Sequence, residues 1–176
     1  MSILLSISVF LNVRCWNSKI LNLGLARASG KLARRICERR VKNPFTTTTD
    51  LADFITSISP RGGKIHPATR VFQALRIAVN NELGVLRSLL ENAATLLKPG
   101  GRLAVITFHS LEDRIVKQFF RHASQSQVDR KEWPEPRPNP DFCYKLLTRR
   151  PVIAGASEIK MNKRSRSAKL RVVEKI

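Results

Sequence analysis

The chain has 176 residues, 43% of them hydrophobic, so it is long enough to bury a core and too apolar to be disordered throughout. Its 32 Lys and Arg residues against 13 Asp and Glu give a formal net charge of +19 at pH 7. This charge favours a polyanionic partner such as nucleic acid, with an anionic membrane as the competing partner. Both flanks, residues 1–65 and 123–176, carry the excess, which fits phosphate contacts spread over a surface.

The cysteines and the apolar segments exclude several other classes. Cys15, Cys37 and Cys143 form no CxxC pair and no even framework, so neither a zinc site nor a disulfide scaffold is predicted, and a reducing compartment is expected. The apolar stretch 3–13 is shorter than the roughly 20 residues that span a bilayer. No Lys or Arg precedes that stretch, which disfavours a signal peptide. We therefore expect a cytoplasmic protein without a membrane partner.

Two helices are predicted in the first third of the chain. In segment 30–43 apolar residues recur on one stripe with arginines around them, which indicates a short basic amphipathic helix that Pro44 ends. The threonine run 46–49 offers N-cap hydroxyls to a second helix. Its apolar residues recur at i, i+3, i+4 and i+7: Leu51, Phe54, Ile55 and Ile58. The proline and glycines of segment 60–63 are predicted to end it.

The strongest periodic signal predicts one long helix over about 70–97. Its apolar residues are spaced by three or four: Phe72, Leu75, Val79, Leu83, Leu86, Leu90, Ala93 and Leu97. The Lys-Pro-Gly-Gly turn at 98–101 closes this helix, since proline cannot continue it and glycine can take the left-handed cap geometry. The run 103–108 is uninterrupted, apolar and rich in β-branched residues, as in a strand covered on both faces. We expect it to be a central parallel strand.

A helix and two short strands are expected after that run. Ser110 to Asp113 resembles a capping box, and the helix behind it has a buried face formed by Leu111, Ile115, Val116, Phe119 and Phe120. Four prolines mark 123–140 as a surface loop. Short strands are predicted over 144–147 and 169–173, with a basic segment between them. The alternation predicts an α/β domain with right-handed crossovers, beside a separate pair of N-terminal helices.

The junction at 108–114 is the best candidate site, because open α/β sheets bind ligands at the carboxyl ends of their strands. His109 could donate to a base or phosphate, Ser110 could bind a ligand as well as cap, and Arg114 could face a phosphate. The alternative is that Ser110 and Asp113 only cap the helix while Arg114 is solvated.

Other polar clusters have two interpretations each. His66 and Arg70 flank Pro67 at the start of the long helix, where a role in helix entry is favoured over chemistry. A basic run near the last strand suits a phosphate-contacting edge or a solvated charge run: Lys163, Arg164, Arg166, Lys169 and Arg171. Three aromatic residues could stack on unpaired bases or pack locally: Trp133, Phe142 and Tyr144.

Several known site signatures are absent from the sequence. The glycine pairs at 62–63 and 100–101 do not stand between a strand and a helix, as a nucleotide or adenosyl cofactor usually requires. There is no GxSxG elbow, no Walker loop and no paired-carboxylate constellation. His66 and His109 have no third ligand at metal spacing, so no metal site is predicted. The residues by themselves indicate a basic α/β domain of unassigned activity.

Several segments together resemble one known family, in the order in which that family has them. They are KLARRICERR, TTTTDLADFI, HPATRVFQALRIAVNNEL, LLKPGGRLAVITFHSLEDRIVKQFFR, KLLTRRPV and RSRSAKLR, and they extend over residues 31–175. These segments are similar to the bacterial small-subunit ribosomal RNA cytosine N4-methyltransferases, the MraW or RsmH family.

This resemblance implies the C-terminal part of a class I, Rossmann-like methyltransferase sheet, with helices from an inserted all-α domain. It implies S-adenosylmethionine as methyl donor, 16S rRNA of the small ribosomal subunit as partner, and transfer to the N4 amine of a cytidine. Residues 1–24 are unassigned, 25–65 would belong to the inserted helical domain, and 66–176 to the methyltransferase domain. The candidates for the RNA side are His109, Ser110, Asp113, Arg114, His66, Arg70, Lys163, Arg164, Arg166 and Lys169.

The family's N-terminal half has no counterpart in this sequence. That half carries the glycine-rich cofactor turn, the acidic ribose-binding position and the loop near the target amine, so no cofactor-binding or catalytic residue is carried over. A sheet reduced to its last three strands would leave one edge unpaired. We expect activity to require the missing half on another polypeptide, or a homodimer. The alternative is a non-catalytic basic rRNA-binding fragment.

Overall fold

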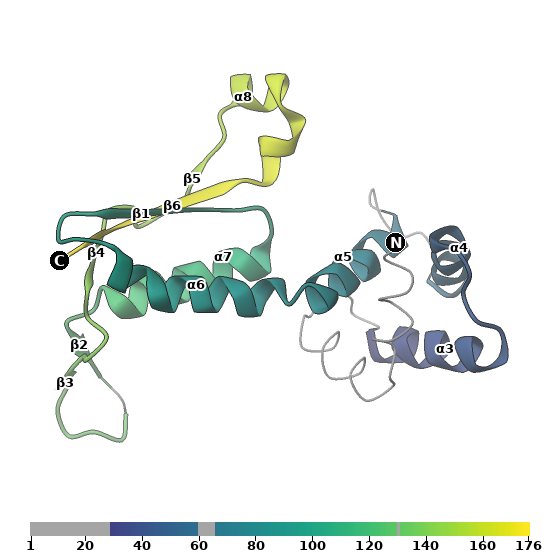
Figure 1. The fold of residues 1–176 in the computed structure, drawn as a ribbon, viewed down its shortest axis with the longest axis horizontal. Helices are drawn as coiled ribbons and strands as arrows, with labels where there is room; N and C mark the ends of the chain where they lie inside the picture. Colours follow the sequence, from purple (N-terminus) through teal and green to yellow (C-terminus); the bar gives the residue numbers. More distant parts are fainter. Residues whose placement is uncertain (1–28, 60–65, 130) are drawn as a thin grey trace. The chain divides into compact units, whose positions relative to one another are not determined.

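A computed structural model of the chain describes residues 29–59, 66–129 and 131–176. The chain divides into two compact units, Met1–Glu82 and Leu83–Ile176. The described part of the first unit is helical, whereas the second combines helices with a sheet (Figure 1). This mixture agrees with the expected α/β class in its general form. The boundary expected at residue 65, between the inserted helical domain and the methyltransferase domain, stays a prediction.

The first unit packs three helices: α3 (Ser29–Lys42), α4 (Thr48–Ile58) and α5 (Pro67–Val79). Its core is Ala33, Ile36, Leu51, Ile55, Ala68, Val71, Ala74 and Leu75. The hydroxyl of Thr47 accepts from the Asp50 amide at 3.0 Å, which confirms the predicted threonine cap. The guanidinium of Arg39 donates to both Asp50 oxygens, at 2.7 and 3.2 Å, and ties α3 to α4. The stop predicted at 60–63 lies outside the described residues.

The prediction of one helix over 70–97 is wrong. Helix α5 ends at Val79, and α6 (Glu82–Leu96) begins three residues later. Between them Asn81 has a φ of 49°, in the left-handed region that asparagine tolerates better than most residues. The Glu82 carboxylate accepts from Arg76 Nε at 2.8 Å and from Asn80 Nδ2 at 3.2 Å, which fixes this turn. The apolar periodicity continues through the break and therefore concealed it.

The sheet of the second unit is centred on β6 (Lys169–Lys175). This strand pairs antiparallel with β1 (Arg102–Thr107), β4 (Tyr144–Leu146) and β5 (Val152–Ile153). The prediction of a central parallel strand at 103–108 is therefore wrong: among the described residues β1 pairs only with β6, and its other edge is unpaired. The two short strands predicted near 144 and 169 are confirmed.

Helices cover one face of this sheet. Both α6 and α7 (Ser110–Ala123) lie along it (Figure 1), and the shared core is Leu90, Val116, Phe120, Ala123, Tyr144 and Val173. On the opposite face Ile106 is 58% exposed and Val152 54% exposed. The expectation that strand 103–108 is covered on both faces is thus wrong within the described part of the chain.

The turns of the second unit are held by a few specific residues. Gly100, with a φ of 80°, lies between α6 and β1, as the Lys-Pro-Gly-Gly turn predicts, and a Cβ on Gly101 would lie 2.8 Å from the Lys98 carbonyl oxygen. The proline-rich loop contains a small ladder of β2 (Gln127–Val128) with β3 (Arg137–Pro138). The buried Asn139 amide donates to the carbonyls of His122 and Gln125, each at 2.8 Å, and so joins this loop to the end of α7.

Between β5 and β6 the chain forms α8 (Ala156–Met161) and the 3-10 helix η1 (Lys163–Ser167). We call residues 149–168 the basic projection: they begin beside the sheet, where β5 pairs with β6, and from residue 154 on they extend away from α6 and α7 (Figure 1). In the described ranges, no helix is both long and apolar enough to cross a bilayer.

Candidate functional site

The junction between β1 and α7 is a closed hydrogen-bonded helix cap. Its N-cap is His109, whose Nδ1 accepts from the Glu112 amide at 3.3 Å. The Glu112 carboxylate in turn accepts from the amides of Phe108 and His109, at 2.9 and 3.2 Å. The prediction of a capping box on Ser110 and Asp113 is therefore wrong by one residue. A histidine N-cap falls outside the usual serine or threonine pattern, and Ser110 is the exposed first residue of the helix.

Because Nδ1 of His109 accepts a hydrogen bond, we assign the ring proton of the neutral form to Nε2. Nε2 is buried and lies 3.3 Å from the Glu112 Oε1 atom, without the geometry of a hydrogen bond. The side chain of His109 is therefore partly engaged in the cap, and one donor is left over. Because this donor is buried, the exposed Ser110 is the more accessible polar side chain of the pair.

Asp113 anchors α7 to the last strand. Its oxygens accept from Arg171 Nε at 2.8 Å and from Lys169 Nζ at 3.2 Å. The Asp113 carboxyl and the Arg171 side chain are both largely buried. Burial by itself would raise the pKa of Asp113, but the hydrogen bonds and charges of Arg171 and Lys169 outweigh it and lower that pKa. A carboxylate with both oxygens occupied is a structural ion-pair member, with little capacity left for a substrate.

Sequence reasoning placed Arg171 in the basic run and missed its buried ion pair with Asp113. Arg171 lies 58 positions from Asp113 along the chain, inside a strand whose neighbours looked like a basic edge. An arginine at an inward position of a strand was the available signal, since a buried arginine requires an acidic partner.

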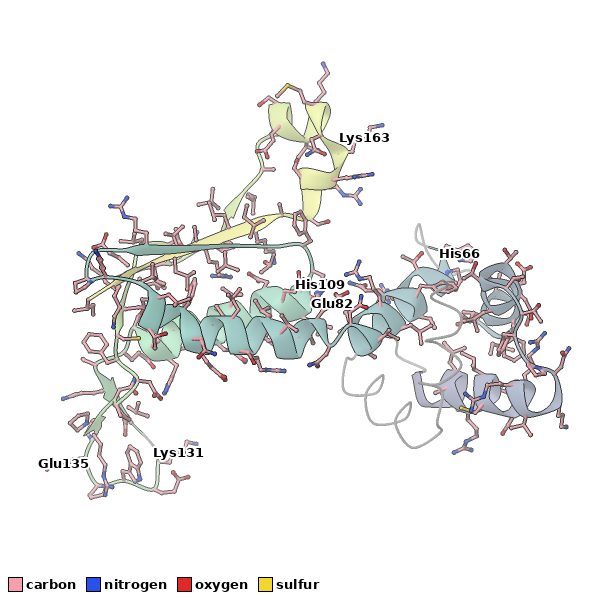
Figure 2. All side chains as sticks on the ribbon, viewed as in Figure 1. His66, Glu82, His109, Lys131, Glu135 and Lys163 are labelled. Carbon is pink, nitrogen blue, oxygen red and sulfur yellow. The ribbon has the colours of Figure 1, made fainter. Side chains whose placement is uncertain are left out.

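The other candidates differ in how far they are committed to the fold. Arg114 is exposed on α7, and among the described residues it makes no ion pair. In the first unit, His66 caps α5 by accepting from the Ala68 amide at 3.3 Å, which agrees with the favoured helix-entry role, and Arg70 is exposed. Figure 2 marks His66 and His109. They belong to different units.

The basic run of the sequence is split by the structure. Lys163, Arg164 and Arg166 are exposed on η1, whereas Lys169 begins β6 and contacts Asp113. Among the aromatic candidates, Tyr144 is fully buried against Phe120, which supports the packing interpretation. The Arg137 guanidinium lies over the Trp133 ring, with its Cζ atom 4.8 Å from the ring centroid. Phe142 is 41% exposed.

The described residues do not fit an adenosyl cofactor by themselves. In the second unit the passage from β1 into α7 is a direct strand-to-helix junction, and the helix N-terminus is where a cofactor's polar groups would be held. Here the Glu112 carboxylate accepts hydrogen bonds from the amides of Phe108 and His109, and neither of these residues is a glycine. We therefore derive no step through the cofactor from these residues.

Comparison with known proteins places this basic, mixed helix-and-sheet chain in a family of methylases. The model of the MraW methylase family matches residues 18–176. The chain belongs to this family. Three curated relatives are each named ribosomal RNA small subunit methyltransferase H. The Bradyrhizobium diazoefficiens relative is 51% identical over 155 residues, that of Magnetococcus marinus 49% over 156, and that of Clostridioides difficile 44% over 149.

These alignments cover 83–87% of this chain but only 46–50% of the relatives. The chain thus spans about half the length of the curated relatives it matches.

Proposed function

We propose that this chain supplies the C-terminal half of a cytoplasmic methyltransferase that transfers a methyl group from S-adenosylmethionine to the N4 amine of a cytidine in 16S rRNA. The observation that carries the proposal is its membership of the MraW methylase family over residues 18–176. The names of the relatives support an rRNA substrate. The net charge of +19 supports it independently, because RNA binding depends on cations that contact phosphates.

In this proposal the chain's own residues bind RNA and hold the sheet rigid. Asp113 keeps α7 fixed against β6 through Arg171. Exposed cations then contact phosphates, with Arg70 and Arg114 as the candidates outside the basic projection. Ser110 presents its exposed hydroxyl at the carboxyl end of β1, next to His109, whose Nε2 is buried. The inserted helical domain of the family would include α3 and α4.

The donor and the catalytic groups would come from the half of the family that this sequence does not contain. Among the described residues one edge of β1 is unpaired, which supports this arrangement, since its amides and carbonyls can accept another strand. The exposed Ile106 on the uncovered face supports it further, because apolar sheet faces are normally covered. Closure of the sheet by a second copy, a homodimer, is the competing arrangement.

The test is reconstitution from two halves. The N-terminal half of the Magnetococcus marinus relative is suitable, because this chain is 49% identical to that protein and spans 50% of it. We expect the mixture to transfer label from S-adenosylmethionine to small ribosomal subunits, and neither half alone to do so. A pair of variants locates the contact: Ile106→Lys, on the open face, should abolish transfer, whereas Val41→Lys, at a more exposed apolar position on α3, should not.

Equilibrium dialysis of labelled S-adenosylmethionine against this chain separates the two arrangements. Binding to the chain alone, with a dimer in solution, would favour the homodimer. No transfer by the mixture, together with intact folding of both halves, would contradict the proposed activity.

The second candidate function is a non-catalytic rRNA-binding fragment. The closed cap at the start of α7 favours it, because no cofactor cradle is formed by the described residues there. Salt-dependent binding to 16S rRNA without methyl transfer in the reconstituted mixture is the result that this candidate predicts.

A further inference from the structure

The basic projection has many more basic than acidic side chains. Residues 149–168 contain a single acidic residue, Glu158, and six basic ones: Arg149, Arg150, Lys160, Lys163, Arg164 and Arg166. All six basic side chains are exposed, and none has an ion-pair partner among the residues that the structure describes. Figure 2 shows Lys163 extending outward from this part of the chain. Such a surface carries an uncompensated positive charge.

The backbone that carries these cations is held in place. At its base β5 pairs with β6, with Val152 opposite Leu170 and Ile153 opposite Lys169. The segment 154–168 therefore leaves the sheet and re-enters it at neighbouring positions. At its outer end the Asn162 side chain accepts from the Arg164 amide at 3.1 Å. The buried Ser165 hydroxyl donates to the Asn162 carbonyl at 2.8 Å. A fixed set of cations loses less entropy on binding than a disordered basic tail does.

The projection also stands at the end of the sheet that carries the candidate site. Thr107, the last residue of β1, pairs with Lys169, the first residue of β6. The chain leaves β1 toward His109 and enters β6 from η1, so both features lie at the same end of the sheet. A polyanion bound to the projection is thereby brought to the start of α7.

We propose that the basic projection is an RNA-docking surface that grips the phosphate backbone of a structured RNA. This inference deepens the proposed rRNA substrate and rests on it. Four of the six cations are arginines, and a guanidinium matches phosphate oxygens through paired donors. A membrane surface fits less well, because α8 has only six residues and presents too little apolar face to lie in a bilayer interface.

The test measures binding of the full 176-residue chain to an in vitro transcript of small-subunit rRNA at several salt concentrations. The triple variant K163Q/R164Q/R166Q leaves Asn162 and Ser165, which fix the turn, untouched. Log affinity decreases with log salt, and we expect the magnitude of this slope to be smaller by about 2–3 in the variant, since each phosphate contact contributes about 0.9 to it. At low salt the affinity should fall about tenfold or more.

The matched control is R87Q/K98Q/K117Q, which removes the same charge from exposed positions of the same unit. It should leave the slope nearly unchanged, and K163R/R164K/R166K should retain binding. The inference would be overturned if both Gln variants lost the same affinity for the transcript, or if neither lost any. It would also be overturned if the K163Q/R164Q/R166Q variant lost affinity for phosphatidylglycerol vesicles but not for the transcript. Absence of methyl transfer with intact binding would instead count against the proposed activity, so the two failures are distinguishable.

Discussion

The two faces of the β1-β6-β4 sheet come from the same strands but have different environments. On the inner face Val173 and Tyr144 are fully buried against α7, and Arg171 is paired with Asp113. On the outer face Ile106 is mostly exposed, and the ion pair of Arg102 with Glu174 lies in solvent. A strand alternates its side chains between faces, so neighbouring residues of β6 experience opposite conditions. The inner face therefore determines the stability of this unit, whereas the outer face is available for a partner.

The largest expected difference between the faces concerns apolar side chains. Phe120→Ala removes a fully buried ring from the inner core and should cost about 3–5 kcal/mol of unfolding free energy. Ile106→Ala removes exposed atoms from the outer face and should change stability by less than about 0.5 kcal/mol. Hydrogen exchange of the β6 amides reports the second unit alone and is the measurement to make. Equal costs at the two positions would mean that the outer face is covered in solution.

The next difference concerns one arginine ion pair on each face of the sheet. Arg171→Met leaves the buried Asp113 carboxylate with Lys169 alone and should cost about 3 kcal/mol. Arg102→Met breaks the exposed pair with Glu174 and should cost about 0–1 kcal/mol. Urea unfolding of both variants gives the comparison directly, because each changes one arginine opposite one carboxylate. A loss at Arg102 as large as that at Arg171 would contradict the assignment of the inner pair as the structural one.

Local patterns were sufficient to locate several of the helices and the longer strands. Periodicity located α3, α4 and α7, and β-branched composition located β1, because these signals depend on residues close together in the chain. Composition could not provide the partner or the direction of β1, since pairing with β6 joins segments more than 60 residues apart. An apolar strand suggested burial on both faces, and the outer face is open among the described residues.

That the junction before α7 is a functional site stays a prediction, and the contacts within that junction differ from those expected. The sequence pointed to the junction before α7, yet the cap uses His109, a residue type outside the usual pattern. It also could not assign Asp113 to Arg171, because charge partners across a sheet follow from register rather than from spacing. The break at Asn81 was missed because apolar periodicity continued through it.

The smallest expected effect is the pH dependence of the inner face. The folded-state pKa of Asp113 is lowered, despite its burial, by Arg171 and Lys169, and its unfolded value is about 3.9. Stabilisation by this group is therefore present above about pH 4 and is lost as the pH falls toward the folded pKa, because the unfolded chain binds the proton first. In Asp113→Asn the unfolding free energy should consequently fall less between pH 5 and pH 3 than in the parent chain. Urea unfolding at each pH measures this difference.

Ile106→Ala is the control for this series, since it leaves every ionisable group in place and should keep the parental pH dependence. Asp113→Asn should be the less stable protein at pH 7, because Arg171 stays buried without its carboxylate, yet its stability curve should be flatter in acid. The substitution should thus lower the unfolding free energy at pH 7 but reduce its further loss in acid. A general loss of stability would not produce both effects. An unchanged acid dependence in Asp113→Asn would assign the acid sensitivity to other carboxylates and would remove Asp113 from the role given to it here.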